Sequence, residues 1–318
     1  MTDHAELDVV TVGEAMALLI AQQHGALDTV QSFARATAGA ELNVAVGLAR
    51  LGLRVAYVSQ LGDDSFGRHL RAFMAREGID TEHVGNDTHH PTGFMLKSLA
   101  TDGEDPAIEY YRRGSAASHL GPQHAPFAAC SRARHLHLTG ISPGVSDSLR
   151  ELVFLMARTA RQDGRTVSFD PNLRPRLWPS EATMRDTLNA LAAESDWVMP
   201  GLTEGRLLTG CDSPEGIADF YLARGAQVVV VKLGPVGAYY ADGEGHRGTV
   251  AGVPVPCVVD TVGAGDGFAV GVVSALLEGL PLAEAVLRGN RIGARVVQFP
   301  GDCDGLPTRQ ELLAERGL

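Results

Sequence analysis

A glycine-rich segment near the C-terminal end of the chain holds residues whose types and spacing could do chemistry. The segment reads DTVGAGDGF from Asp260 to Phe268, and the apolar run 269–277 that follows predicts a buried helix. Glycines leave backbone N–H groups open at a helix start, where those groups and the helix dipole attract an anion. The carboxylate of Asp266 lies in the same turn and could accept a proton from a nearby hydroxyl group. Together they meet the needs of phosphoryl transfer to an alcohol, although an ordinary glycine turn capped by an aspartate has the same composition.

Short apolar runs alternate with helical patterns along the chain, and these elements must position the segment. Strands are predicted at 8–12, 55–58, 135–138, 166–169, 197–199 and 228–233. Helices are predicted at 42–51, between 65 and 78, at 146–161, 181–193 and 214–224, and within 265–317. Alternation of near-continuous apolar strands with helices predicts an α/β fold whose mainly parallel sheet is covered on both faces.

Two regions, 15–35 and 91–113, break this alternation. Each looks like antiparallel strands joined by turn residues, so we predict a small discontinuous β lid. The remaining residues, 1–14, 36–90 and 114–318, would form a three-layer αβα body. The lid strands are apolar with few residues beneath them, so we expect a homo-oligomer joined through the lid.

Composition and charge narrow the class of protein further. The 318 residues carry a net charge of −11, which excludes a general nucleic-acid binder. No run of 18 apolar residues occurs, and no basic segment precedes an apolar one at the N-terminus, so we expect neither a membrane partner nor a signal peptide. The four cysteines lie far apart without a C-x-x-C pair, which favours reduced thiols and a cytoplasmic protein.

The GAGDGF motif, together with TAGAELNVAVGLARLG at 37–52, resembles the ribokinase-like sugar kinases of the PfkB type. The resemblance extends from Val10 to about Leu313. It implies a ribokinase-like fold, ATP as the phosphoryl donor and a requirement for Mg²⁺. It also implies that Asp266 is the catalytic base, that an anion hole is formed by the amides of Gly263, Ala264 and Gly265, and that the sugar pocket includes Gly39 and Asn43.

A second glycine motif resembles the nucleotide-side loop of the same family. Lys232, Gly234 and Gly237 form a K-x-G-x-x-G pattern after a valine-rich strand, although a tight β-turn would explain it equally well. The resemblance also places Asn290 and Gly293 near the adenine. No G-x-x-x-x-G-K-[ST] sequence occurs, so this is not a P-loop enzyme.

The metal sites implied by the resemblance are only partly matched. Family members commonly carry an N-x-x-E motif that orders the water shell of Mg²⁺, and Glu204 is present here while Gly201 stands in place of the Asn. We therefore expect Glu204 to act on Mg²⁺ indirectly, alone or through water. The resemblance also suggests that Asp260 and Val262 could offer oxygen atoms to a monovalent cation such as K⁺.

Two stretches indicate the substrate. YYRRGSAAS at 110–118 and DPNLRPRLW at 170–178 resemble those of 2-keto-3-deoxygluconate kinases, and the second is shared with bacterial fructokinases. Because arginine binds carboxylates bidentately, Arg113 and Arg174 are predicted to hold the carboxylate of an acid sugar, and the resemblance adds Tyr111 to the substrate site. We expect ATP-dependent phosphorylation of its 6-hydroxyl group.

Three alternatives remain open to different degrees. A fructokinase or another neutral-sugar kinase of the same fold is the closest. A nucleotide-binding regulator without catalysis is disfavoured by the intact motif around Asp266. A Rossmann-type dehydrogenase is disfavoured because VGEA at 12–15, rather than G-x-G-x-x-G, follows the first strand.

Overall fold

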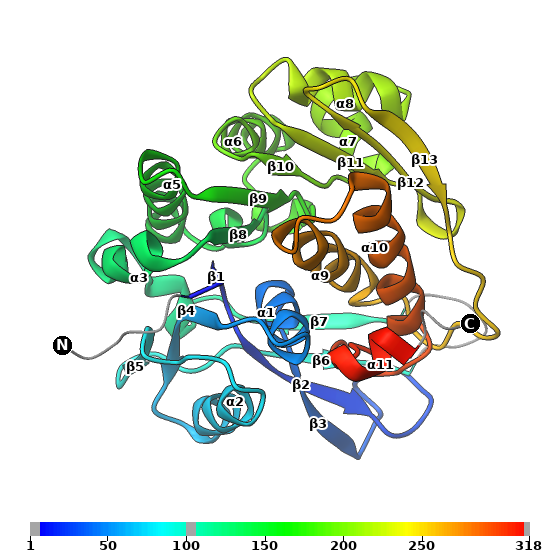
Figure 1. The fold of residues 1–318 in the computed structure, drawn as a ribbon. Helices are drawn as coiled ribbons and strands as arrows, with labels where there is room; N and C mark the ends of the chain where they lie inside the picture. The colour runs from blue at the N-terminus through cyan, green and yellow to red at the C-terminus, as the bar shows by residue number, and fades with distance from the viewer. Residues whose placement is uncertain (1–6, 100–105, 315–318) are drawn as a thin grey trace.

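The computed structural model describes residues 7–99 and 106–314 and is built on a nine-stranded sheet (Figure 1). The strand order is β13-β12-β11-β10-β9-β8-β1-β4-β5. In this order, every adjacent pair of strands from β11 through β5 is parallel. At the other edge, β12 is antiparallel to both β11 and β13. The strands are β1 (Val9–Val12), β4 (Val55–Gly62), β5 (Val84–Asp87), β8 (His135–Thr139), β9 (Thr166–Asp170), β10 (Trp197–Val198), β11 (Val228–Lys232), β12 (Gly237–Asp242) and β13 (Arg247–Ala251).

Helices cover both faces of this sheet, as the alternating pattern predicts. One core joins the sheet to α3 (Phe127–Arg132), α5 (Asp147–Gln162), α6 (Glu181–Ala193), α7 (Leu202–Thr209) and α8 (Pro214–Leu222). The opposite core joins it to α1 (Ala40–Arg50), α2 (Ser65–Arg76), α9 (Ala264–Leu277), α10 (Leu282–Val296) and α11 (Arg309–Ala314). A single turn, α4 (Ser142–Val145), precedes α5. This is the predicted three-layer ribokinase-like α/β architecture with a mainly parallel sheet.

The ends of two helices follow from local hydrogen bonding. Asp64 caps α2 by accepting the backbone N–H of Gly67 at 2.7 Å, and Ser146 caps α5 by accepting that of Leu149 at 3.2 Å. Helix α9 buries ten residues in succession, which agrees with the apolar run that predicts a core helix. No helix among the described residues is long and apolar enough to cross a membrane.

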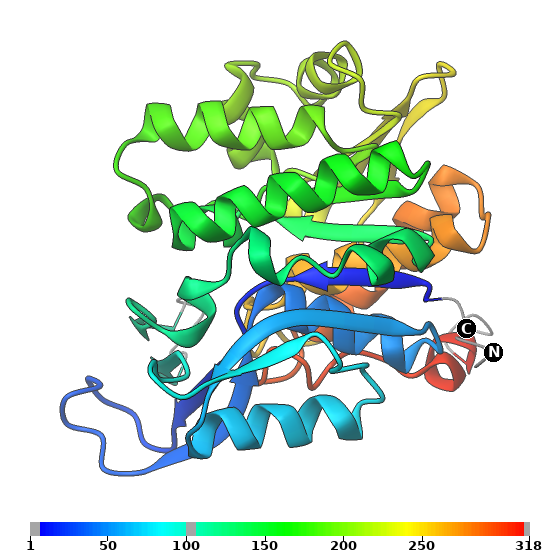
Figure 2. The same cartoon turned by 90° about the vertical axis from the view of Figure 1, so that its left-hand side faces the viewer.

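A second, four-stranded sheet has the order β3-β2-β6-β7 and forms the lid (Figure 2). Its strands are β2 (Met16–Ala21), β3 (Phe33–Ala38), β6 (Phe94–Lys97) and β7 (Ile108–Tyr111), so β3 extends beyond the predicted limit at residue 35. The sheet is mixed rather than purely antiparallel, because β2 and β6 pair in parallel.

The inner lid face is less open than its apolar sequence predicts. Met16, Leu18 and Met95 are at most 4% exposed within a single chain. Side chains alternate between the two faces of a strand, and these three share the face that lies over the sugar-sized cavity described below. The outer face carries half-buried Leu19 and Phe94, so the apolar surface of the lid that remains accessible is on this face.

Candidate active site

A cavity of about 380 Å³ lies between the lid and the carboxyl ends of the parallel strands. Ligands of open α/β sheets bind at this edge, because the loops that follow the strands meet there. The lid contributes Met16, Met95, Ile108 and Tyr110, and the first turn of α1 with its cap contributes Gly39 and Asn43. The body contributes Asp170, Asn172, Arg174, Glu204, Lys232, Val262, Gly263, Gly265 and Asp266.

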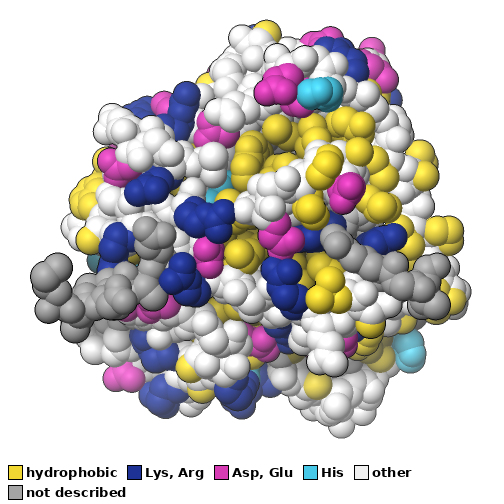
Figure 3. Space-filling view, viewed as in Figure 1, with side chains coloured by type: hydrophobic (Ala, Val, Ile, Leu, Met, Phe, Trp, Pro, Cys, Tyr) yellow, Lys and Arg dark blue, Asp and Glu magenta, His cyan; other side chains and the backbone are white. Residues whose placement is uncertain are grey.

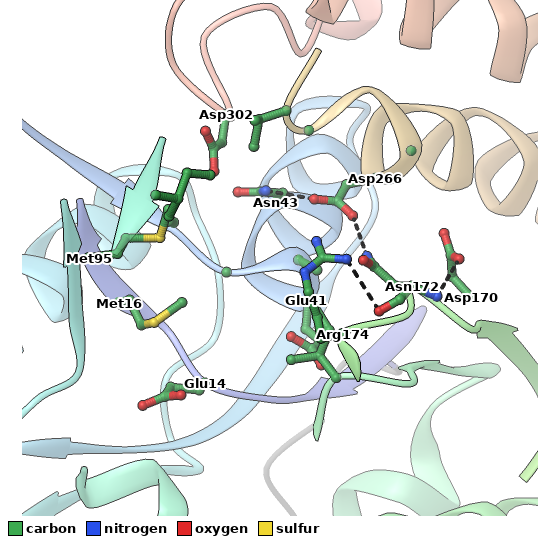
Figure 4. Close-up of a pocket in the computed structure, with 18 of the residues that line it drawn as sticks. Glu14, Met16, Glu41, Asn43, Met95, Asp170, Asn172, Arg174, Asp266 and Asp302 are labelled. Atoms are coloured by element: carbon green, nitrogen blue, oxygen red, sulfur yellow. Dashed lines mark hydrogen bonds between the residues drawn. The ribbon is translucent and has the colours of Figure 1, made fainter. Parts of the chain in front are cut away.

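Asp266 is held at the centre of this cavity by two amides (Figure 4). Asn43 Nδ2 donates to its Oδ2 at 2.7 Å, and Asn172 Nδ2 donates to its Oδ1 at 3.3 Å. Burial raises the pKa of Asp266 to about 7, while the hydrogen bond from Asn43 opposes the shift. A carboxylate with this pKa is suited to accept a proton near neutral pH.

The start of α9 beside Asp266 is built to expose backbone N–H groups. Gly263 adopts a left-handed φ of 84°, and a Cβ there would lie 2.7 Å from the carbonyl oxygen of Asp302. Glycine is therefore required at this position. The first N–H groups of an α-helix have no partner within the helix, although Ala264 donates weakly to Thr261 O at 3.3 Å. This turn can receive an anion.

Lys232 marks the junction with a second cavity of about 360 Å³. Lys232, Thr261 and Gly265 line both cavities, and Lys232 Nζ lies 2.6 Å from Asp170 Oδ2. Burial acts to lower the pKa of Lys232, but the carboxylates of Asp170 and Glu204 raise it above its ordinary value. The ammonium group is therefore charged where the two cavities meet.

The second cavity is mainly apolar and lies beside α10 and the β12–β13 hairpin. Hydrophobic side chains gather on this face of the molecule (Figure 3). The wall is formed in part by Gly234, Gly237, Val253, Val258, Ala264, Phe268, Asn290, Gly293 and Val297. A planar, largely apolar group such as a nucleobase fits such a wall, and phosphates attached to it would extend toward Lys232.

Comparison with known proteins places this geometry in a family. The model of the pfkB family of carbohydrate kinases matches residues 6–309. The chain belongs to this family of carbohydrate kinases. The kinase is 49% identical to 2-dehydro-3-deoxygluconokinase of Bacillus subtilis, over 96% of this chain and 94% of the relative. It is 32% identical to the 2-dehydro-3-deoxygluconokinase of Thermoproteus tenax, over 96% of this chain and 93% of that relative.

Solved structures of other proteins have the same fold as this ATP-dependent kinase. A PfkB protein from Polaromonas sp. JS666 is 53% identical, covers 97% of this chain and 99% of its own, and superposes with a TM-score of 0.90. An E. coli protein assigned as a ribokinase II, in complex with ATP and Mg²⁺, is 26% identical, with a TM-score of 0.89 over 98% and 99% of the two chains. A Vibrio cholerae fructokinase double mutant with fructose, ADP and potassium is 28% identical, with a TM-score of 0.85 over 97% and 98%.

Two substrate residues predicted for the kinase lie away from the cavity. Tyr111 is on the outer face of β7, stacked on Phe94 at 4.6 Å, and Arg113 is exposed beyond the strand. The physical reason is strand alternation: Tyr110 lines the cavity, so Tyr111 faces away from it. Arg112, rather than Arg113, reaches the cavity.

Arg112 and Arg174 differ in how their charge is used. Arg112 is 9% exposed, and its Nε lies 2.6 Å from Glu14 Oε2, so its charge is already paired. Arg174 Nη1 donates only to backbone carbonyls, at 2.9 Å from Leu173 O and 3.4 Å from Asn172 O. Among the described side chains no carboxylate lies within ion-pair distance of Arg174, which leaves its charge available to a ligand.

Glu204 and Asn290 line the cavities, but much of their hydrogen-bonding capacity is used within the chain. Glu204 Oε2 accepts the N–H of Gly201 at 2.7 Å, which caps α7, and its Oε1 accepts that of Leu173 at 2.8 Å. Asn290 Nδ2 donates to the carbonyls of Val250 and Ala251, which fixes β13 against α10. The amide of Asn290 therefore shapes the wall of the second cavity rather than offering it a free donor.

The residues suggested for K⁺ do not fit a free cation. Asp260 lines neither cavity; its Oδ1 accepts the N–H of Val262 at 3.0 Å, and its Oδ2 forms an ion pair with Lys97. The negative charge that K⁺ would need is thus already neutralised by an ammonium group. The sequence-based expectation of K⁺ at Asp260 and Val262 did not include this lysine from the distant strand β6, and it stays a prediction.

Proposed function

We propose that this kinase transfers the γ-phosphoryl group of ATP to the 6-hydroxyl group of 2-keto-3-deoxygluconate, also called 2-dehydro-3-deoxygluconate. The products are the 6-phosphate and ADP. The observation that carries the proposal is the unpaired guanidinium of Arg174 in the same cavity as Asp266, since a carboxylate on the sugar would pair with it. The 49% identity to the Bacillus subtilis relative supports the same substrate. We assign the reaction to the cytoplasm, where its donor is found.

In the proposed mechanism each cavity holds one substrate. ATP lies in the second cavity with its phosphates toward Gly265 and Lys232, and the sugar lies under the lid with its carboxylate toward Arg174. Asp266 accepts the proton of the 6-hydroxyl group as the oxygen attacks the γ-phosphorus. The N–H groups of Gly263, Ala264 and Gly265 and the ammonium of Lys232 stabilise the charge of the transferring group. ADP leaves with the bridging oxygen.

The donor set near Lys232 fits Mg²⁺ bound mainly through water. Mg²⁺ keeps several waters and uses one or two carboxylates together with substrate phosphates, where it neutralises phosphate charge. Both oxygens of Glu204 accept a backbone N–H, so Glu204 would reach the ion through its remaining lone pairs and bound water. Asp170, paired with Lys232, is the other carboxylate on this side of the cavity.

A substrate panel tests the proposal. ADP release should be measured with ATP, Mg²⁺ and a series of acid and neutral sugars, with 2-keto-3-deoxygluconate expected to give the highest kcat/KM. The DPNLRPRLW stretch is shared with fructokinases, and the fructokinase alternative predicts the highest value with fructose. Release of ADP with none of the sugars would instead support a nucleotide-binding regulator.

The pH profile should report the raised pKa of Asp266. A base acts only when deprotonated, so kcat/KM should be full above the pKa of about 7 and fall about tenfold per pH unit below it. An ordinary aspartate would give this fall near pH 4. Steady-state rates between pH 5 and 9, with circular dichroism as a check on folding, test this. A flat profile down to pH 5 in folded enzyme would contradict the assignment.

We also propose that the lid, residues 15–35 and 91–113, is the surface through which the kinase forms a homo-oligomer. Its outer face combines half-buried Leu19, Phe94 and Leu96 with Tyr111, which is 49% exposed. Light scattering at micromolar concentration should give a mass above the 33.6 kDa of one chain, and Leu19→Glu should lower it. A mass of one chain for the unaltered protein would contradict the proposal.

A further inference from the structure

Lys97 is a buried cation that the proposed mechanism does not use. It belongs to β6 in the lid, its side chain is 2% exposed, and it is on the face of the lid that covers the sugar cavity. Its ammonium forms an ion pair with Asp260 Oδ2, lies 3.1 Å from Asp302 Oδ1 and donates to Pro300 O at 3.4 Å. One lid side chain therefore bridges two segments of the body.

The two segments that Lys97 joins border the predicted anion hole. Asp260 fixes the turn before α9, because its Oδ1 accepts the N–H of Val262 and its own N–H donates to Val297 O. The carbonyl of Asp302 lies against Gly263, where a Cβ would be only 2.7 Å away. The turn that presents the α9 N–H groups is thus held between two carboxylates that Lys97 neutralises.

Removing this charge would act on the anion hole in two ways. The buried carboxylates of Asp260 and Asp302 would repel each other, which would loosen the turn, and their negative charge would oppose the phosphoryl group entering it. A monovalent cation between them prevents both effects. The Vibrio cholerae fructokinase was solved with potassium bound, and in this chain a lysine ammonium forms an ion pair with Asp260.

We propose that Lys97 is a tethered monovalent cation that orders the anion hole, so that this kinase needs no free K⁺ for activity. Lys97 is a positioning residue, since it acts through Asp260 and Asp302 and lines neither cavity. The inference rests on the proposed function only in that the reaction is phosphoryl transfer at α9.

The test compares cations in the unaltered enzyme and in variants. The unaltered enzyme should have the same kcat with potassium as with tetramethylammonium salts at equal ionic strength. Lys97→Ala should lose about tenfold or more in kcat, with a smaller change in KM for ATP, and should regain activity with K⁺ or ammonium ions. Lys97→Met should lose as much but regain little, because its side chain fills the space.

A matched control is Arg288→Ala. Arg288 is also a buried cation, 5% exposed and paired with Glu278, but it lies near the far end of α9. Its removal should lower the melting temperature without making kcat respond to K⁺. This control separates loss of a buried charge in general from loss of the cation beside the anion hole.

Two results would overturn the inference. One is a severalfold rise in kcat of the unaltered enzyme on adding K⁺. This measurement does not depend on the folding of any variant. The other is folded Lys97→Ala whose activity does not respond to K⁺ or ammonium. Rates are read on whichever sugar releases ADP fastest, so an error in the proposed sugar leaves the cation ratios unaffected.

Discussion

Asp266→Asn is expected to lower kcat by at least about 100-fold while ATP still binds, because general-base assistance contributes roughly 10²–10⁴-fold. Asparagine keeps the size of the side chain but cannot accept the proton of the sugar hydroxyl group. Asp266 is buried, and two amides donate to its carboxylate and hold it in place. Steady-state kinetics and ATP titration of the purified variant measure the two quantities separately.

Asp304→Asn is the matched control for this variant. Asp304 is an exposed carboxylate in the loop that also carries Asp302, and it does not line the sugar cavity. Its replacement should leave kcat within about twofold of the unaltered enzyme, as is usual for surface substitutions. A kcat of Asp266→Asn above about one tenth of the original would contradict the role of Asp266 as base.

Arg174→Ala is expected to lower kcat/KM for 2-keto-3-deoxygluconate by about 10- to 150-fold. Hydrogen bonds to charged groups contribute roughly 1.5–3 kcal/mol, and Arg174 is the cavity cation without a carboxylate partner among the described residues. Activity on fructose should change far less, because fructose has no carboxylate to lose. The ratio of the two losses is the quantity to measure, since a folding defect would lower both equally.

Two arginines provide controls for that ratio. Arg176 is exposed in the same loop, and Arg113 is exposed beyond β7. Alanine at either position should leave kcat/KM for both sugars within about twofold of the unaltered enzyme. A large selective loss in Arg113→Ala would contradict the placement of the lid, and parallel losses on both sugars in Arg174→Ala would remove the carboxylate role from Arg174.

Local sequence predicted the helix start at the centre of the site, and the family resemblance assigned its role. The glycines before Asp266 and the apolar run after it specify a helix start at the edge of a sheet, and α9 begins at Ala264 as this requires. Asn43 and Asp266 are 223 positions apart in the sequence. The family resemblance, rather than their spacing, assigned both residues to the site. In the structure a hydrogen bond of 2.7 Å joins their side chains.

The sequence could not predict which residues of lid strand β7 face the cavity, because this depends on the register of strand pairing. YYRR contains two tyrosines and two arginines in succession, and a shift of one residue exchanges the two faces of a strand. The pairing of Met95 with Tyr110 directs Tyr110 and Arg112 toward the cavity, and no local pattern specifies that register. The β12–β13 hairpin was missed because its second strand, RGTVA, is short and mostly exposed at the sheet edge.

Long-range pairing of charges was the other limit. Lys97 and Asp260 are far apart in the chain, and a lysine in a lid strand is ordinarily expected in solvent. Only the folded lid brings that ammonium to the turn before α9, where it pairs with Asp260. The same holds for Glu14, which neutralises Arg112, whereas Arg174 has no carboxylate partner among the described residues.

Identification of the product tests the central claim most directly. The unaltered enzyme should be incubated with ATP, Mg²⁺ and 2-keto-3-deoxygluconate and followed by phosphorus NMR. We predict one new phosphomonoester, coupled to the two protons of C6 and formed in equal amount with ADP. ADP without a sugar phosphate, a phosphate on another hydroxyl group, or a phosphorylated product only when fructose replaces the acid sugar would contradict the account.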